Sequence, residues 1–138
     1  MGSSLSILRL FSVLAVFMAL VISLFGRQVG AAVAQGAADA AAIAVTDLLP
    51  PDWTCAESDL PSDALATASR AAAGRAAQLA SVTPTAVEVR TDGTCSVIVS
   101  VRVASHGWLA TAGALGVACR RPSFARGAAL QAPLPPPC

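Results

Sequence analysis

Four cysteines are the residues of this chain best suited to covalent chemistry: Cys55, Cys95, Cys119 and Cys138. No two of them are closer than 19 positions, so the Cys-x-x-Cys pairs typical of zinc sites do not occur. The spacing therefore predicts disulfides formed in an oxidising compartment rather than a metal site. Four cysteines allow three pairings, and the sequence does not choose among them. One of the three joins Cys95 to Cys119, which we expect on the inward sides of two neighbouring strands.

The chain carries few residues for acid–base or phosphate chemistry. His106 is the only histidine, nothing points to an acidic partner for it, and lysine and tyrosine do not occur. The acidic residues of segment 52–63 lack the dense alternate spacing of a calcium loop, and there is no glycine-rich phosphate loop. We therefore expect no enzyme activity, no cofactor, no metal and no small-molecule substrate. A net charge of +1 argues against nucleic acid as a partner.

An uncharged apolar stretch, "LFSVLAVFMALVISLFG" at 10–26, dominates the N-terminal part. Together with Leu5 to Leu8 it makes about 33 Å of helix, enough to cross the hydrocarbon core of a bilayer. Arg9 and Arg27 flank the stretch, so the flanking charge barely favours either orientation. All four cysteines follow it, which places the C-terminal part on the oxidising side. We expect a single-pass cell-membrane protein with a cytoplasmic N-terminus and an exported C-terminal domain.

The next segment, 27–49, continues the helical pattern until Pro50 and Pro51 end it. A helix from about Ser4 to Leu49 would be roughly 69 Å long. Polar residues form one stripe along it: Gln28, Gln35, Asp39 and Thr46. Small and apolar residues at three- and four-residue spacing predict a helix-packing surface that contacts other subunits: Val29, Gly30, Val33, Ala34, Gly36, Ala37, Ala40 and Ala44.

The stretch "RQVGAAVAQGAADAAAIAV", directly after the apolar span, resembles the N-terminal region of TadE/TadG-like Flp pilus-assembly proteins. In that family a membrane helix is followed by an arginine and an alanine-rich run with a fixed glutamine and aspartate. The matching positions are Arg27, Gln35, Ala37, Ala38, Asp39, Ala40, Ala41, Ala42, Ile43 and Ala44. The resemblance covers the first third of the chain. It implies a membrane-anchored minor pilin-like subunit or assembly factor, whose partners are the membrane and other pilin-like or pilus-assembly subunits.

Two routes of N-terminal processing stay open. Gly2 and Ser3 stand where the mature region of that family begins, which makes them a candidate processing site. However, Ile7 replaces the glutamate of such chains and only Met1 precedes Gly2, so either the true start codon lies further upstream or the anchor stays unprocessed.

A cleaved signal peptide is a different alternative, with its apolar region at 10–25 and its cleavage site near Ala34. It would release a secreted, disulfide-stapled binding protein. We favour the anchor, because the apolar region is long for a signal and Arg27 lies close to that site.

Five segments follow from these patterns: a transmembrane helix at 1–26, its helical extension at 27–49, a proline-rich linker at 50–63, an exported α+β domain at 64–121 and a proline-rich tail at 122–138. Trp53 and Cys55 can pin the linker to the domain. Four prolines between Ala132 and Cys138 predict an extended polyproline tail.

The exported domain should contain one short helix and an antiparallel sheet of two or three strands. The helix is expected at 64–80, capped by Ser62 or Asp63, with one apolar stripe: Leu65, Ala68, Ala72, Ala76 and Leu79. Two strands alternate around an Asp92-Gly93 turn, and Cys95 should share the inward face of the second strand with the valines at 97, 99, 101 and 103. A third strand would turn Leu115, Val117 and Cys119 inward. The fold class is therefore α+β, with a helix covering one face of the sheet.

Overall fold

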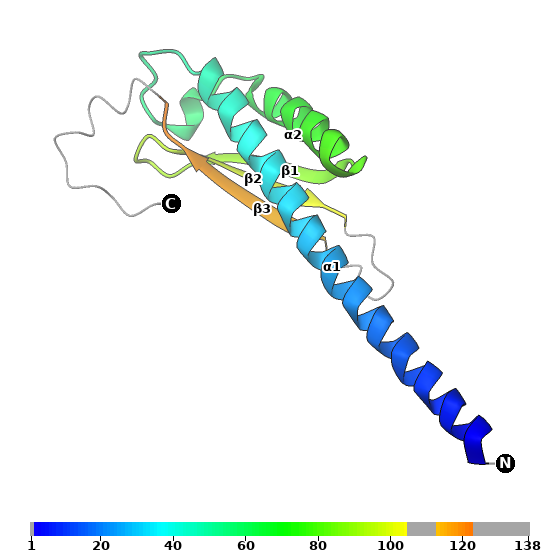
Figure 1. Cartoon of the computed structure of the whole chain (residues 1–138). Helices are drawn as coiled ribbons and strands as arrows, with labels where there is room; N and C mark the ends of the chain where they lie inside the picture. Colours follow the sequence, from blue (N-terminus) through cyan, green and yellow to red (C-terminus); the bar gives the residue numbers. More distant parts are fainter. Residues whose placement is uncertain (1, 105–112, 123–138) are drawn as a thin grey trace.

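The structure, a computed structural model, describes residues 2–104 and 113–122. The fold is α+β, with a long N-terminal helix α1 (Gly2–Leu48), a short 3-10 helix η1 (Glu57–Asp59) and a second helix α2 (Ala64–Ala80). Three strands, β1 (Pro84–Thr91), β2 (Val97–Val103) and β3 (Ala114–Arg120), form an antiparallel sheet in the order β1-β2-β3. Figure 1 shows α1 projecting far beyond the sheet at its N-terminal end. We call residues 7–29 the stalk and the described residues from 33 onward the head.

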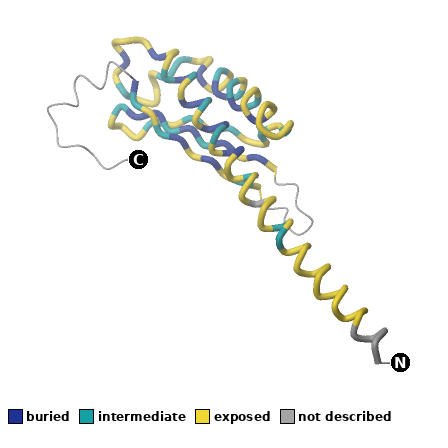
Figure 2. The backbone as a smooth tube through the Cα atoms, in the orientation of Figure 1, coloured by how far each residue is buried: buried dark blue, intermediate teal, exposed yellow. Residues whose placement is uncertain are grey.

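Helix α1 has two halves with opposite surfaces. Figure 2 shows the stalk almost entirely exposed, whereas the part of α1 inside the head is largely buried on one side. The buried residues recur every three or four positions: Val33, Ala34, Ala37, Ala38, Ala41, Ala42 and Val45, followed by Leu49 just beyond the helix. The helix ends at Leu48 because the ring of Pro50 disfavours helical backbone before it and Pro51 provides no N–H donor. The expected long helix is therefore confirmed to within two residues at each end.

Two alanine-lined helices lie side by side on one face of the sheet (Figure 1). Helix α2 buries a row of four alanines at every fourth position: Ala64, Ala68, Ala72 and Ala76. Helix α1 contacts β2 and β3, and α2 contacts β1. Between the layers lie the fully or almost fully buried valines of the central strand: Val97, Val99, Val101 and Val103. The core is consequently small and consists mostly of alanine and valine.

Helix α2 has the predicted bounds, but its buried row begins one residue earlier than expected. Ala64 is buried, whereas Leu65 and Leu79 are 53% and 45% exposed. Asp63 occupies the N-cap position without a hydrogen bond from its side chain. Leu65 lines a pocket beside β1 instead, and the Cδ1 atom of Leu79 lies over Gly36 of α1.

The facing of β3 is opposite to the prediction. Gly116 and Ala118 are buried under α1, while Leu115 and Val117 are 55% and 47% exposed and point to the open side of the sheet with Cys119. The reason is the distance between two backbones. A Cβ atom added at Gly116 would lie 2.1 Å from the carbonyl oxygen of Ala34. Only small residues fit at this crossing, so the larger side chains of β3 must face away.

Replacing Gly116 tests the crossing. Gly116→Ala should lower the free energy of unfolding of the head by about 2 kcal/mol or more, because the new methyl group would force α1 and β3 apart. Gly74→Ala is the matched control, since its new methyl group meets nothing within 4 Å on the outer side of α2. It should raise the free energy of unfolding by about 0.5–1 kcal/mol through better helix propensity. Urea titration of both variants in detergent measures this, and effects of the same sign would contradict the crossing.

Candidate functional site

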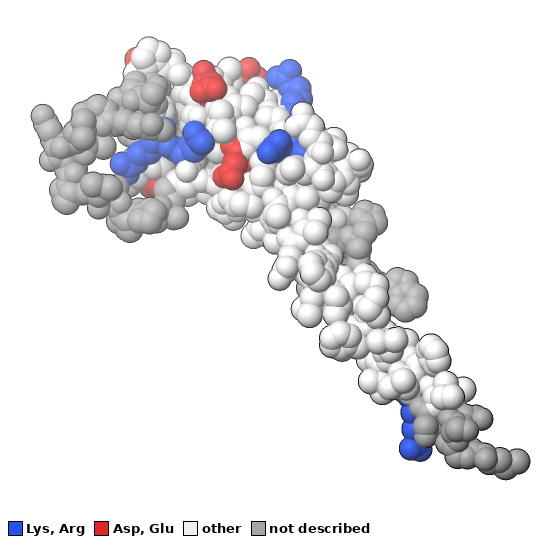
Figure 3. Space-filling view, in the orientation of Figure 1, with Lys and Arg blue, Asp and Glu red and all other residues white. Residues whose placement is uncertain are grey.

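The stalk is the surface of this molecule that most requires a partner. Arg9 is the only charged residue between positions 7 and 26. Large apolar side chains that are more than half exposed line it: Ile7, Leu8, Leu10, Phe11, Val13, Leu14, Val16, Phe17, Met18, Leu20, Ile22, Leu24 and Phe25. Helix α1 is long and apolar enough to cross a membrane. Figure 3 shows the contrast: the charged side chains gather on the head, and the shaft of the stalk is nearly free of them.

The stalk is apolar on all sides, which is typical of a helix surrounded by lipid or by other helices. Residues 7–25 would span about 28 Å, close to the thickness of a hydrocarbon core. Its two described hydroxyl side chains are satisfied within the helix. Ser12 donates to the carbonyl of Arg9 and Ser23 donates to that of Ala19. Between residues 10 and 26, backbone and side chains are therefore both compatible with a medium that offers no hydrogen bonds.

Gln35 fixes α1 to the outer edge of β3. Its Nε2 donates to the carbonyl of Val117 at 2.9 Å, and the N–H of Val117 donates to its Oε1 at 3.3 Å. Because β3 is an edge strand, this amide takes the place of a neighbouring strand at one point of the edge. Asp39 lies one turn further along α1 and accepts from the same Nε2 at 3.4 Å. Two positions of the predicted polar stripe therefore have an intramolecular role that the sequence did not reveal.

Much of the predicted subunit-contact surface is used inside the chain. Val33, Ala34 and Ala37 are buried in the head's own core. Gly36 faces α2, where the Cδ1 atom of Leu79 would lie 2.9 Å from an added Cβ. These residues therefore pack tightly against other elements of the same chain. Ala40 and Ala44 are partly exposed on the head, and Gly30 is partly exposed just below it. Of the predicted surface, only Val29 is more than half exposed, at 54%.

Cys55 and Cys95 form a disulfide that joins the linker after α1 to the β1–β2 turn. Cys119 is disulfide-bonded as well, and Cys138 lies outside the described residues. The pairing of Cys95 with Cys119 is wrong, because Cys95 precedes β2 in a left-handed turn conformation (φ +62°) and Cys119 lies on the open side of the sheet. Trp53 is only 6% exposed, so the linker is held against the core as expected.

Asp92 organises the turn that presents Cys95. Its carboxylate accepts hydrogen bonds from the N–H of Thr94 at 2.8 Å, the hydroxyl of Thr94 at 2.7 Å and the N–H of Ser96 at 3.1 Å. Partial desolvation acts to raise the pKa of Asp92, but these hydrogen bonds outweigh it, and the pKa lies below its ordinary value. Gly93 supplies the left-handed residue (φ +73°) that the Asp-Gly pair predicted. The role of this carboxylate is structural.

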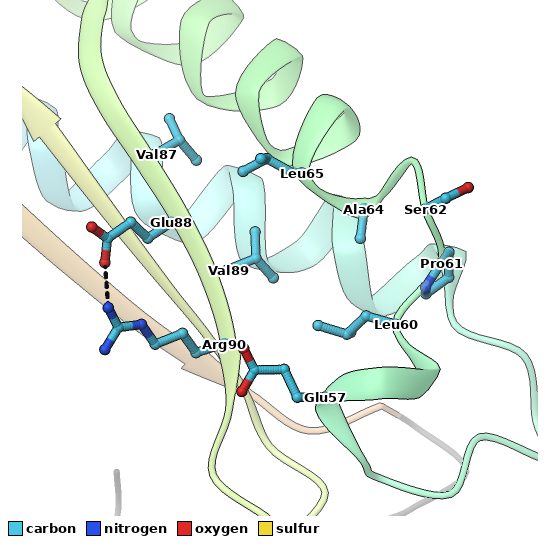
Figure 4. Close-up of a pocket in the computed structure, with 10 residues that line it drawn as sticks. All are labelled: Glu57, Leu60, Pro61, Ser62, Ala64, Leu65, Val87, Glu88, Val89 and Arg90. Carbon is cyan, nitrogen blue, oxygen red and sulfur yellow. Dashed lines mark hydrogen bonds and ion pairs between the residues drawn. The ribbon is translucent and has the colours of Figure 1, made fainter.

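A pocket of about 330 Å³ lies between η1, the start of α2 and the edge strand β1 (Figure 4). Its aliphatic lining comprises Leu60, Pro61, Ala64, Leu65, Val87 and Val89. Glu88 and Arg90 form an ion pair of 3.0 Å and point away from α2, on the other side of β1 (Figure 4). The described residues contain no group of three His, Cys, Asp or Glu side chains suited to a metal, and His106 lies outside them. Glu57 and Ser62 complete the lining, so the pocket is mainly apolar with one carboxylate from η1.

Removing the Cys55–Cys95 disulfide should destabilise the head. Its two cysteines are 40 positions apart, so replacing both with serine should lower the free energy of unfolding by about 2–4 kcal/mol, because the unfolded chain gains freedom. Urea titration of the oxidised wild type and of the double variant measures the difference. An unchanged midpoint would show that this bridge contributes nothing to stability.

Gln35→Ala should lower the free energy of unfolding by about 1–2 kcal/mol, because both hydrogen bonds to Val117 are lost. Gln28→Ala, at an exposed position of the same helix, is the matched control and should change it by less than about 0.5 kcal/mol. Gln35→Glu should not restore the free energy of unfolding, since a carboxylate cannot donate to the carbonyl of Val117 and repels Asp39. Hydrogen exchange at the amide of Val117 provides a second readout, expected to be faster in Gln35→Ala, because the oxygen that accepts from this amide is lost. Equal effects of the two alanine variants would refute the edge pairing.

Comparisons of the chain with protein-family models, with curated proteins and with solved structures gave no match. The stalk, the junction at Gln35 and the residue pattern of α1 are thus the features on which a proposal for its function rests.

Proposed function

We propose that this chain is a membrane-anchored minor pilin-like subunit or assembly factor of a Flp/Tad-type pilus or a related secretion system. The observation that carries the proposal is the continuity of α1. One unbroken helix is apolar and exposed along the stalk and then supplies the core of the head from Val33 onward. A signal sequence that is removed has no need of such continuity. A subunit whose head must keep a fixed position relative to a membrane or a helical bundle requires it.

The residue pattern that resembles TadE/TadG-like proteins has a physical use in this chain, which supports the proposal. Its alanine run provides the flat surface on which α2 and the sheet pack, with Ala37, Ala38, Ala41 and Ala42 fully buried. Its glutamine, Gln35, holds the edge of β3, and its aspartate, Asp39, accepts a hydrogen bond from the Gln35 side chain. The pattern therefore fits a helix that packs against a sheet directly after its membrane span.

The site near Ala34, where a signal peptidase would cut, is poorly placed for release of the head. Ala34 is completely buried, and its carbonyl lies against Gly116. A cut there would remove Val33 from the core and leave Gln35 at a free helix end. It would also open the crossing of α1 and β3. These contacts favour an anchor that is retained over a secreted binding protein.

The activity proposed for this chain is association. Lipid covers the stalk while the protein resides in the membrane, and helices of other subunits cover the same apolar surface in an assembly. The disulfide bonding of Cys55, Cys95 and Cys119 supports a head on the exported side and an N-terminus in the cytoplasm, because disulfides persist in oxidising compartments.

Fractionation of the native cell envelope tests the proposal. The chain should remain with the membrane after alkaline washing, begin at Met1, Gly2 or Ser3, and co-purify with pilus-assembly subunits. Val16→Arg places a charge in the middle of the stalk, which costs about 2.5–3.5 kcal/mol on insertion and should deplete the membrane fraction. Ala66→Arg, at an exposed position of α2, is the matched control and should leave the amount of chain in the membrane fraction unchanged. A soluble chain that begins at Gln35 would rule the proposal out.

A further inference from the structure

The stalk enters the head without a linker, and this brings one end of the sheet close to the membrane. Strand β3 runs in the same direction as α1 (Figure 1), and Gly116 of β3 meets Ala34 of α1. The start of β3 therefore lies on the side of the head from which the stalk emerges. The cross-strand partners at this stalk-side end are Ala86, Arg102 and Leu115 in one row, and Pro84, Val103 and Ala114 in the next.

The distance from this end to the bilayer follows from helix and strand geometry. If residues 7–25 fill the hydrocarbon core, the headgroup layer adds roughly 5–8 Å and reaches to about residue 29 or 30 of α1. A strand residue advances about 3.3 Å and a helical residue 1.5 Å, so Leu115, one position before Gly116, is level with about Ala32. The stalk-side end of the sheet is thus within a few ångströms of the lipid headgroups.

The chemistry of the stalk-side end fits an anionic lipid surface. Leu115 and Val29 are 55% and 54% exposed there, and Arg102, the cross-strand partner of Leu115, is exposed as well. The one ion pair among the described residues joins Glu88 and Arg90, so the charge of Arg102 is not neutralised by a described carboxylate.

Acidic residues lie further from the stalk. Neither of the two rows at the stalk-side end contains an Asp or Glu, and the first acidic residue along α1 is Asp39. Glu88, the nearest acidic residue of β1, lies two residues beyond Ala86, further from the stalk, and forms an ion pair with Arg90. The described residues at the end of the head that faces the stalk are consequently apolar and cationic.

We propose that this end of the head docks on the headgroups of an anionic leaflet, with the guanidinium of Arg102 on lipid phosphate and Leu115 and Val29 against the boundary of the acyl chains. A planar guanidinium binds a phosphate through two parallel hydrogen bonds, and each arginine near an anionic surface strengthens attachment about fivefold. Docking would limit the tilt of the stalk and head, as one rigid unit, relative to the bilayer. The inference rests on the membrane anchoring proposed above.

Vesicle reconstitution of the full chain tests the docking. A fluorophore that reports polarity is attached at Ala104→Cys, an exposed position after β2, and separately at Ser62→Cys, near the opposite end of the head. No described native cysteine is free to react. In vesicles that contain phosphatidylglycerol, the emission of the label at 104 should shift to shorter wavelength. Spin labels on the lipid headgroups should quench this emission. In vesicles of pure phosphatidylcholine, the emission of the label at 104 should shift less. The label at 62 should show the emission of a water-exposed fluorophore in both kinds of vesicle.

Two charge variants provide the matched comparison. Arg102→Gln should reduce the docked-to-undocked ratio on anionic vesicles about fivefold, whereas Arg120→Gln, at the far end of β3, should leave it unchanged. Equal responses of the two variants, or a label at 104 that reports water on both lipids, would overturn the docking. Flotation separates the two proposals: a chain that floats with an aqueous label at 104 refutes docking alone, and a chain that does not float refutes the anchor and the docking together.

Discussion

The architecture depends on one contact in which no side chain takes part: the backbone of α1 at Ala34 lies directly against the backbone of β3 at Gly116. This crossing determines which side of β3 faces the helices, because only glycine and alanine fit under α1. It brings the free edge of Val117 to the amide of Gln35. It also brings the backbones close enough for the small side chains of an alanine and valine core to meet.

That close packing has a mechanical consequence for the proposed role. Because the helix that would cross the membrane is the same helix on which the sheet is built, the stalk and the head meet without a hinge. A core this small is marginally stable on its own. The linker disulfide, the buried Trp53 and the hydrogen-bonded turn at Asp92 compensate by tying the segments between elements to the head. A subunit that must hold its head at a defined height above a bilayer benefits from this stiffness.

The periodic features of the structure could be predicted from the sequence. Apolar and alanine-rich spacing indicated α1 and the bounds of α2, and alternating valines with Asp92 and Gly93 indicated the hairpin of β1 and β2. The facing of β3 could not be predicted, since Gly116 is small because of a helix that lies more than 80 positions earlier in the chain. Hydrophobicity alone favoured Leu115 and Val117 as core residues. The disulfide partner of Cys95 depended on a left-handed turn residue, and the partner of Gln35 on the edge of a strand, neither of which has a signal in residue spacing.

If one rigid helix carries the head out of the membrane, as proposed, the distance between a spin label in the stalk and one in the head has a fixed value. Labels at Leu14→Cys in the stalk and Asp47→Cys near the end of α1, both exposed positions, are separated by about 50 Å along a straight helix. In lipid nanodiscs, pulsed electron resonance should give a narrow distribution centred near that value. A broad distribution, or one centred well below it, would show a break between stalk and head and would contradict the account.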